Sequence, residues 1–290
     1  MTNEENLRQI LNISEKDALI LRPLERKTRN PNFILLINNE PTYFIKNHII
    51  NGAKEKIVYE FLEESPVVTS IKPVYIDDSV IITPYLSGLS DCDIENNLEF
   101  ILQFHTNLLN LSPERYSPFS NNSQFKNNTV ENFRDLVRNN QNLIPTFWEN
   151  INKLNNFAER YSIDFGNFPK TFCHGDIHPR NLQIDKDGNI YLVDFENSCY
   201  DFPSWDLARA LLELNPQKRD SFIEEYVKRL NFKDKVILTR RINKDYVLAA
   251  ITHIIKRQRK LGVEDSRSYI KDFKSRCFDK MEEILNNKDN

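Results

Sequence analysis

The chain has 290 residues, which is enough to bury a sizeable core as one large domain or as two lobes. Its net charge of −3 at pH 7 leaves no basic footprint for nucleic acid, so we expect no nucleic-acid partner. Four cysteines without paired spacing favour reduced thiols, and the absence of a signal-peptide pattern or a long apolar run leads us to expect a cytoplasmic protein without membrane contact.

The first 86 residues read as short helices and strands. Apolar residues at helical spacing predict helices at 4–13 and 53–62. Runs rich in β-branched and aromatic residues predict strands at 18–24, 33–37, 43–46, 71–76 and 80–83. The turn between the first two strands, residues 25–32, is charged and contains no glycine.

From residue 87 onward the pattern is mainly helical. Helical periodicity predicts helices at 94–111, 130–138, 146–161, 205–214, 221–230, 242–261 and 268–285. The polar, proline-containing stretch 112–128 is typical of a surface loop. His105 lies among apolar residues of the first of these helices, which indicates a packed structural residue.

Residues 171–214 contain the most informative pattern in the chain. Asp176 follows His174-Gly175 and precedes Asn181 by five residues, in a loop broken by glycine and proline. Two short strands, 182–184 and 190–193, then flank the turn 185–188, and the second strand ends at Asp194. The hairpin therefore allows Asp176, Asn181 and Asp194 to converge at one end.

Three such groups suit phosphoryl transfer. One carboxylate orients and deprotonates an attacking hydroxyl, while an amide oxygen and a second carboxylate hold Mg²⁺ on nucleotide phosphates. A zinc site formed by His174 and His178 is disfavoured, because Gly175 and Pro179 argue against a helix there. Paired-carboxylate glycoside hydrolysis gives no role to Asn181.

These motifs resemble the aminoglycoside phosphotransferase and choline kinase superfamily, which are small-molecule relatives of the protein kinases. The matching pieces are His174-Gly175-Asp176, Asn181, Val193-Asp194-Phe195-Glu196 and Trp205-Asp206-Leu207-Ala208. The resemblance implies an α+β, bilobal protein-kinase-like fold. Its N-terminal nucleotide-binding lobe, residues 1–86, would hold an antiparallel β-sheet with one main helix, and residues 87–290 would form a mostly helical catalytic and substrate-binding lobe.

The resemblance also assigns roles and cofactors. It implies ATP and Mg²⁺ as cofactors, with Asp176 as the general base and Asn181 and Asp194 as magnesium ligands. Lys46 matches the strand lysine that pairs the α and β phosphates, and Glu55 matches the helix glutamate that holds it. Asp206 matches a residue that braces the catalytic loop.

The hinge between the lobes would take the adenine base. The carbonyl of Pro84 and the N–H of Leu86 stand at the matching positions, and a proline keeps its carbonyl. The turn at residues 25–32 departs from the family because it lacks the glycine that lets backbone N–H groups approach phosphate. Arg26, Lys27, Thr28 or Arg29 is then an alternative source of phosphate contacts, beside simple solvated charge.

The acceptor is expected to be a small molecule that carries an amine, either an aminoglycoside-type antibiotic or an amino alcohol like choline or ethanolamine. Acidic and aromatic residues after the motif suit a cation by charge and by cation–π attraction, and the alternative is that the aromatics are core. The candidates are Glu196, Tyr200, Asp201 and Trp205. The rival reading is a catalytically weak kinase-fold binding or scaffold protein, favoured by the missing glycine turn and opposed by the intact Asp176, Asn181 and Asp194. A protein kinase is disfavoured, because no Asp-Phe-Gly occurs at Asp194.

Overall fold

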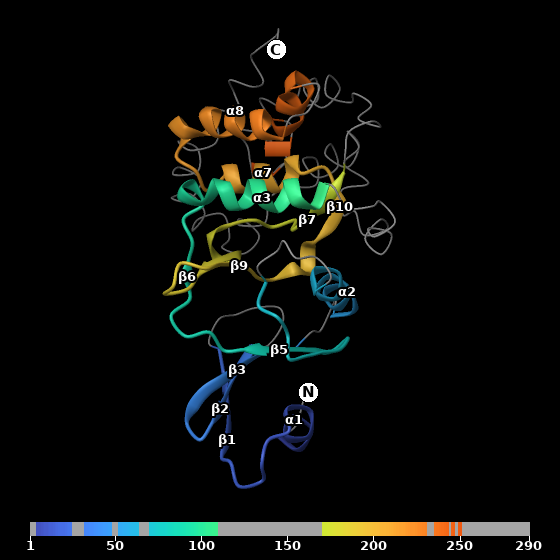
Figure 1. Ribbon diagram of the computed structural model, residues 1–290, viewed down its shortest axis with the longest axis vertical. Helices are drawn as coiled ribbons and strands as arrows, with labels where there is room; N and C mark the ends of the chain where they lie inside the picture. The colour runs from blue at the N-terminus through green and yellow to red at the C-terminus, as the bar shows by residue number, and fades with distance from the viewer. Residues whose placement is uncertain are drawn as a thin grey trace, which may run out of the picture. The chain divides into compact units, whose positions relative to one another are not determined.

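The computed structural model describes residues 4–24, 32–47, 52–63, 70–109, 170–230, 235–243, 245–246 and 249–250 (Figure 1). The chain forms two compact units, each made of two segments. The first contains Met1–Cys92 and Pro179–Ser198, and the second contains Asp93–His178 and Cys199–Asn290. Residues 179–198 therefore belong with the N-terminal segment, whereas the predicted lobes 1–86 and 87–290, which stay a prediction, put them in the second lobe. The helices predicted at 130–138, 146–161 and 268–285, and the loop 112–128, lie outside the described residues.

The first unit is built on a five-stranded antiparallel sheet in the order β1-β2-β3-β5-β4 (Figure 1). Its strands are β1 (Leu19–Pro23), β2 (Asn32–Ile37), β3 (Glu40–Asn47), β4 (Tyr75–Ile76) and β5 (Val80–Pro84). The strand predicted at 71–76 is shorter than expected. Pro73 has no N–H to give to a ladder, and the first described bond to β5 comes from Val74 N–H to Ile82 O.

Local turn chemistry fixes the two hairpins of this sheet. Asn38 and Asn39 have φ of 51° and 70°, the left-handed conformation that a two-residue hairpin turn requires and that asparagine tolerates. Asp77 closes the other turn, because its Oδ1 accepts the N–H groups of Ser79 and Val80 at 2.7 and 2.8 Å. These side chains fix the β2–β3 and β4–β5 hairpins, and the separate pairing of β3 with β5 places Lys46 opposite Ile81.

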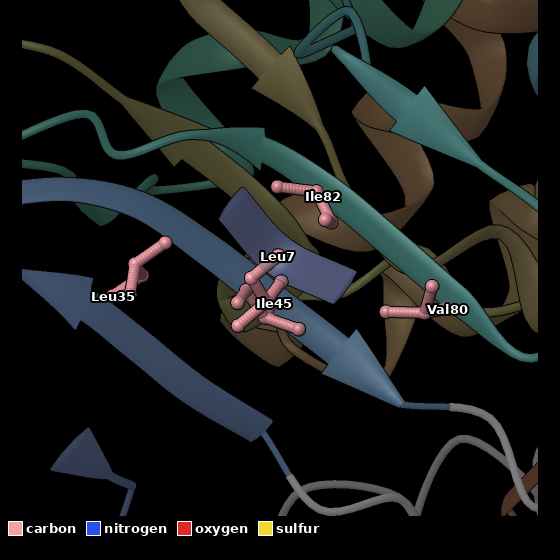
Figure 2. Close-up of a cluster of buried hydrophobic side chains, with 5 residues drawn as sticks. All are labelled: Leu7, Leu35, Ile45, Val80 and Ile82. Atoms are coloured by element: carbon pink, nitrogen blue, oxygen red, sulfur yellow. The ribbon is translucent and has the colours of Figure 1, made fainter. Parts of the chain in front are cut away.

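Helix α1 (Glu4–Leu11) packs on this sheet through the buried Leu7, with the partly buried Ile10 and Leu11 beside it (Figure 2). Leu7 has no exposed surface and lies over Ile45 of β3. The rest of the buried cluster comes from the sheet itself, and its members are Leu35, Ile45, Val80 and Ile82. This cluster holds β3, the strand that carries Lys46, in the middle of the sheet.

The remaining parts of the first unit are one helix and a small sheet. Helix α2 (Gly52–Glu63) matches the helix predicted at 53–62. The predicted hairpin is present as β8 (Leu182–Ile184) and β9 (Ile190–Leu192), and β6 (Ser90–Asp91) adds a third antiparallel strand. Asp185 Oδ1 accepts the N–H groups of Asp187 and Asn189, and Gly188 has φ of 84°, so the turn is a hairpin turn as predicted.

The described part of the second unit is mainly helical. Its helices are α3 (Leu98–Leu109), α7 (Ser204–Leu211) and α8 (Arg219–Arg229), with further helical residues at 235–243. That last segment begins seven residues before the predicted helix at 242. A two-stranded ladder of β7 (Thr171–Cys173) and β10 (Cys199–Asp201) places Cys173 opposite Cys199. Helix α3 packs against β7 and α8 (Figure 1).

The predicted fold class is confirmed, with an antiparallel sheet and one main helix in the first unit and helices in the second. Within the described residues, no helix is both long enough and apolar enough to cross a bilayer.

Candidate active site

Asn181 and Asp194 lie side by side at one end of the β8–β9 hairpin. Asn181 ends the short 3₁₀ helix Pro179–Asn181, and its carbonyl accepts the N–H of Val193 at 3.0 Å. Asp194 follows directly, in the left-handed conformation with φ of 67° and ψ of 64°. A non-glycine residue held in that conformation is strained, and such residues gather at functional sites.

Lys46 connects this hairpin end to helix α2. Its Nζ donates to Asp194 Oδ1 at 2.7 Å and to Glu55 Oε2 at 2.8 Å. Burial lowers the pKa of Lys46, but the carboxylates of Glu55 and Asp194 raise it further, so the net pKa is above the ordinary value. Lys46 is therefore a permanent cation, and we call Lys46, Glu55, Asn181 and Asp194 the hairpin cluster.

Glu55 is the buried anchor of the hairpin cluster. Its side chain is 1% exposed, and its second oxygen accepts the N–H of Phe195 at 3.2 Å. Burial raises the pKa of Glu55 more than the Lys46 ammonium lowers it. Tyr59, one turn further along α2, packs its ring edge-on against Phe195 at 5.4 Å. Lys54 Nζ also donates to the carbonyl of Glu196 at 3.0 Å, so α2 holds the segment after Asp194 by three separate contacts.

The donor set of the hairpin cluster fits a magnesium nucleotide. Asn181 and Asp194 offer hard oxygen ligands, and the Asp194 side chain is 43% exposed. Among the described residues, no group of three or more His, Cys, Asp or Glu could hold a metal ion. Two protein ligands are compatible with Mg²⁺, which keeps several waters and takes further oxygens from substrate phosphates.

The proposed hinge follows β5 in the same unit. Pro84 is the last residue of that strand, and the next N–H, from Tyr85, donates to the carbonyl of Thr42 at 2.9 Å. This bond turns Tyr85 back toward the sheet between the two positions assigned to adenine, Pro84 and Leu86. The alternative phosphate contacts, Arg26, Lys27, Thr28 and Arg29, lie outside the described residues.

In the second unit, Asp176 is held by an arginine. Arg209 of α7 donates to Asp176 Oδ1 through Nη2 at 2.7 Å and through Nε at 3.0 Å. The other carboxylate oxygen lies 3.7 Å from His178 Nε2. Burial raises the pKa of Asp176, but Arg209, His178 and His174 lower it further, and the net pKa is below the ordinary value.

The backbone before Asp176 is held by Asp206. This fully buried carboxylate accepts the N–H of His174 at 2.7 Å and the N–H of Gly175 at 2.6 Å. His105 of α3 lies 3.1 Å from Asp206 Oδ2 and 2.5 Å from the hydroxyl of Tyr226 on α8. His105 therefore has a structural role, as predicted. It connects α3 and α8 to the Asp206 carboxylate, which binds the loop.

Trp205 supports the same loop from a buried position. Its indole N–H donates to the carbonyl of Gly175 at 3.2 Å, and the residue is 8% exposed. We call Asp176, Asp206, Arg209 and the loop residues 174–178 the loop cluster. Trp205 serves this cluster, and its assignment to acceptor binding stays a prediction.

The other acceptor candidates differ in their surroundings. Asp201 is buried and accepts the N–H of Phe202 at 2.8 Å, and burial raises its pKa above the ordinary value. Tyr200 is half-buried on β10, and Glu196 is half-buried just after Asp194. The ring of Phe202, next to Asp201, already has two cations near it, because Arg241 lies 4.7 Å and Lys170 5.4 Å from the ring centroid.

Arg209 is the functional candidate that the sequence analysis missed. It stands three residues after Asp206 on α7, a spacing that puts both side chains on one helix face. Asp206 was already predicted to brace the catalytic loop. The three-residue spacing could therefore have indicated that Arg209 contacts the same loop.

Comparisons with known proteins identify a matching family and similar folds. Residues 95–238 match the model of the phosphotransferase enzyme family. The fold is similar to the choline kinase LicA from Streptococcus pneumoniae, at 17% identity, with 97% of this chain and 99% of that chain covered and a TM-score of 0.56. It is also similar to APH(2″)-IIa in a ternary complex with streptomycin and ATP, at 18% identity, 98% and 99% coverage and a TM-score of 0.61.

A third similar structure is the GDP complex of aminoglycoside 2′-phosphotransferase-IIIa, at 13% identity, with 98% of each chain covered and a TM-score of 0.63. No curated protein sequence matches the chain significantly. Over residues 95–238 the chain matches the phosphotransferase enzyme family, and the similar structures show that it shares the kinase-like fold of aminoglycoside phosphotransferases and of a choline kinase.

Proposed function

We propose that the protein transfers the γ-phosphate of ATP, taken up with Mg²⁺, to a hydroxyl group of a small molecule that carries an amine. The observation that carries this proposal is the position of Lys46, whose ammonium lies between the carboxylates of Glu55 and Asp194. A cation fixed before substrate arrives stabilises phosphate charge without having to reorganise. Asn181, beside Asp194, adds the amide oxygen that a magnesium nucleotide would use.

The reaction needs one bond to form and one to break. The acceptor hydroxyl oxygen attacks the γ-phosphorus, the bond to the β–γ bridging oxygen breaks, and ADP leaves. Asp176 orients the hydroxyl and receives its proton. Lys46 pairs the α and β phosphates, and the backbone at Pro84 and Leu86 takes adenine. Asn181 and Asp194 would hold Mg²⁺, which would supply positive charge against the nucleotide phosphates.

The amine on the acceptor is proposed from two lines of support. Glu196 is a half-buried carboxylate close in sequence to Asp194, and Glu213 is an exposed carboxylate just after α7. Two of the similar structures are a choline kinase and a streptomycin complex, and choline and streptomycin are both cations. With Phe202 already covered by Arg241 and Lys170, we assign recognition of the amine to carboxylates rather than to cation–π contacts.

The transfer step is tested with Asp176→Asn. With Mg²⁺-ATP and a panel of amino alcohols, aminoglycosides and sugars, we expect the wild type to phosphorylate at least one amine-bearing acceptor. Asp176→Asn should lower kcat by about 10²-fold or more, the usual loss of a general base, while nucleotide affinity stays nearly unchanged. The matched control is Asp187→Asn, an exposed aspartate of the hairpin turn, which should behave like the wild type. Nucleotide binding without transfer to any acceptor would favour the binding or scaffold protein instead.

The amine is tested separately, by comparing an accepted substrate with its neutral analogue. We expect the neutral analogue to have a higher KM, and Glu196→Gln to raise the KM of the amine substrate only. An equal KM for both substrates would point to a sugar or nucleoside acceptor and leave the transfer mechanism intact.

A further inference from the structure

Two buried cysteines face each other across the short ladder of β7 and β10 (Figure 1). Cys173 pairs with Cys199 in the register, and both residues are fully buried. Directly opposite residues of an antiparallel ladder project to the same face, with Cα atoms about 4.5–5.5 Å apart. A disulfide needs Cα atoms about 4.4–6.8 Å apart, so the backbone at this position is within range of a bridge.

The two thiols are in contact in the folded chain. The Cys173 thiol makes a side-chain hydrogen bond with Cys199. Its sulfur also lies 3.5 Å from the carbonyl oxygen of Asp201, on β10, and 3.4 Å from that of Phe202, the next residue. The Cys173 side chain therefore points toward β10, which is the direction that a bridge to Cys199 requires.

We propose that Cys173 and Cys199 form a modification site, a dithiol that a peroxide oxidises to a cross-strand disulfide. The inference is independent of the proposed phosphate transfer, because it needs neither nucleotide nor acceptor. The bridge ties together the two ends of the segment 174–198, which passes from the second unit into the first and ends where the second resumes. That segment contains the proposed magnesium ligands Asn181 and Asp194.

The oxidation is balanced by the peroxide alone. One thiolate of the pair attacks a peroxide oxygen and becomes a sulfenic acid, while the O–O bond breaks and the other oxygen leaves as hydroxide, which takes up a proton. The second thiolate attacks that sulfur, the S–S bond forms, the S–O bond breaks and water leaves. Two thiols lose two hydrogens in total, and one peroxide is reduced to two waters.

Burial makes this reaction slow. The thiolate is the reactive form, and burial, followed by the Cys199 thiol and the charge of Asp206, raises the pKa of Cys173 well above its usual range. The cysteine pair is the last pair of a ladder of three, beside His174, so only this end has to fray before a thiolate forms. The same burial then keeps reducing agents from the finished bridge. We therefore expect slow oxidation and a long-lived product.

The alternative is that both cysteines serve only as small apolar residues of the core. Packing alone gives no reason for the two sulfurs to react with each other. An oxidant that reached them would then produce sulfenic, sulfinic or sulfonic acid on single cysteines. The products of oxidation therefore distinguish a built dithiol from two core residues.

The test oxidises the full chain carrying Cys277→Ser with hydrogen peroxide and counts the thiols that remain. Iodoacetamide in guanidinium chloride labels every thiol left, so the untreated protein should take three labels, one for each remaining cysteine. After oxidation we expect one label, at Cys92, a mass lower by two hydrogens, and a cross-linked peptide that holds Cys173 and Cys199. Three labels after prolonged oxidation, acids on single cysteines, or a bridge to Cys92 would overturn the proposal.

Two further variants in the same background test the pairing. In Cys199→Ala, Cys173 loses its partner and should keep its label after the same treatment. Cys92→Ala is the matched control, a buried cysteine of the first unit, and should still form the bridge. Protection of Cys173 in Cys199→Ala would show that the cysteines do not react as a pair. Should Cys199→Ala fail to fold, the cross-linked peptide from the chain carrying only Cys277→Ser decides.

The effect of the bridge is measured by thermal unfolding. A disulfide restricts the unfolded segment 174–198, so the oxidised protein should unfold at a temperature higher than the reduced protein by roughly 5 °C. The same peroxide treatment should leave the unfolding temperature of Cys199→Ala unchanged. A bridge that forms without raising the unfolding temperature would contradict the proposed tie between the two ends of the segment.

Discussion

The Asp194 carboxylate has two proposed partners, the Lys46 ammonium and Mg²⁺. Its Oδ1 accepts the Lys46 ammonium, and its oxygens are the proposed ligands for Mg²⁺ on the nucleotide. A bound metal ion and the Lys46 ammonium would therefore compete for the Asp194 carboxylate or share it. Lys46 also has a second hydrogen bond, to Glu55. We expect Glu55 to hold Lys46 in place when Asp194 is replaced, which allows the two contributions to be separated.

We predict that Asp194→Ala abolishes the effect of Mg²⁺ on ATP affinity. The metal loses a carboxylate ligand while the phosphate charge remains. Calorimetry with and without EDTA measures this, and Asp187→Ala, in the exposed turn of the same hairpin, is the control. Equal Mg²⁺-ATP affinity in wild type and variant would mean that the metal binds elsewhere.

Lys46→Ala is predicted to weaken binding of ATP more than binding of adenosine, because the proposed contact is with phosphate alone. Titrations of both ligands check it, and the exposed Lys186→Ala is the comparison. Loss of Lys46 also leaves Glu55 buried without its cation, so a lower unfolding temperature is expected as well. An equal loss of affinity for ATP and for adenosine would mean that Lys46 acts through the stability of the fold and not through a phosphate contact.

The sequence predicted some of these residues better than others. Asp176, Asn181 and Asp194 were expected to converge at one hairpin end. Asn181 and Asp194 lie there, because the turn chemistry at residues 185–188 fixes the register, whereas Asp176 belongs to the second unit. Their roles stay a prediction. Arg209 was not recognised, since an arginine on a helix is common and only its partner makes it special. The cations beside the Phe202 ring have no local signal either, because Lys170 and Arg241 come from distant positions in the sequence.

At the level of elements, α7 is the part that positions the loop cluster. Its first turn carries Trp205, which binds the carbonyl of Gly175, and Asp206, which binds two N–H groups of the loop. These N–H and carbonyl groups of His174 and Gly175 therefore take their hydrogen-bond partners from α7. The conformation of the loop thus depends on a helix that follows it by about thirty residues, as the bond between Trp205 and Gly175 shows.

We predict that Asp206→Ala lowers the free energy of unfolding by about 3 kcal/mol or more, because two buried N–H groups lose their acceptor and each unsatisfied group costs about 1–3 kcal/mol. Denaturant unfolding measures the change. The control is Glu224→Ala on α8, an exposed helix position where changes stay within about 0.5 kcal/mol. A loss for Asp206→Ala as small as the control would show that water replaces the carboxylate.

Elements with strong local signals were predicted well. Helix α2 and the β8–β9 hairpin match within a residue or two, because periodicity and turn residues determine them. The strands β7 and β10 were missed because, unlike β8 and β9, they are not joined to each other by a short turn. Tyr200 pairs with Phe172, 28 residues earlier in the chain, and such a pairing is set by tertiary packing.

For the whole molecule, the paired Asp176 makes stability depend on pH. Its folded-state pKa is below the unfolded value of about 3.9, so the pairing stabilises the folded chain above about pH 3.9. This contribution is lost as the pH falls through the folded-state pKa, because the protonated acid no longer balances Arg209.

We therefore predict that Asp176→Asn lowers the unfolding temperature near neutral pH and that the difference from wild type shrinks in acid. Thermal unfolding over a pH series checks this, and Asp187→Asn should show no such trend. A difference that stays constant with pH would mean that the carboxylate charge does not contribute.

The fold class was predictable because the order of elements and the motif together resemble one superfamily. The division into units was harder to predict, because residues 179–198 join the N-terminal segment across a long separation in sequence. Two contacts connect these segments: the β-bridge between Ser70 and Leu192 and the pairing of β6 with β8. Neither contact is indicated by a local sequence pattern.

Each unit contains a buried cysteine thiol, whose reaction with a labelling reagent can report local unfolding of that unit. Cys92 lies in the first unit, Cys173 and Cys199 lie in the second, and all three are buried thiols outside any disulfide. Burial above all, and then the Cys199 thiol, raise the pKa of Cys173 well above its usual range, so an alkylating reagent reaches a reactive thiolate only when the strand opens. In a Cys277→Ser background, labelling rates read by mass spectrometry then time the opening of the two units separately, and equal rates mean that the units open together.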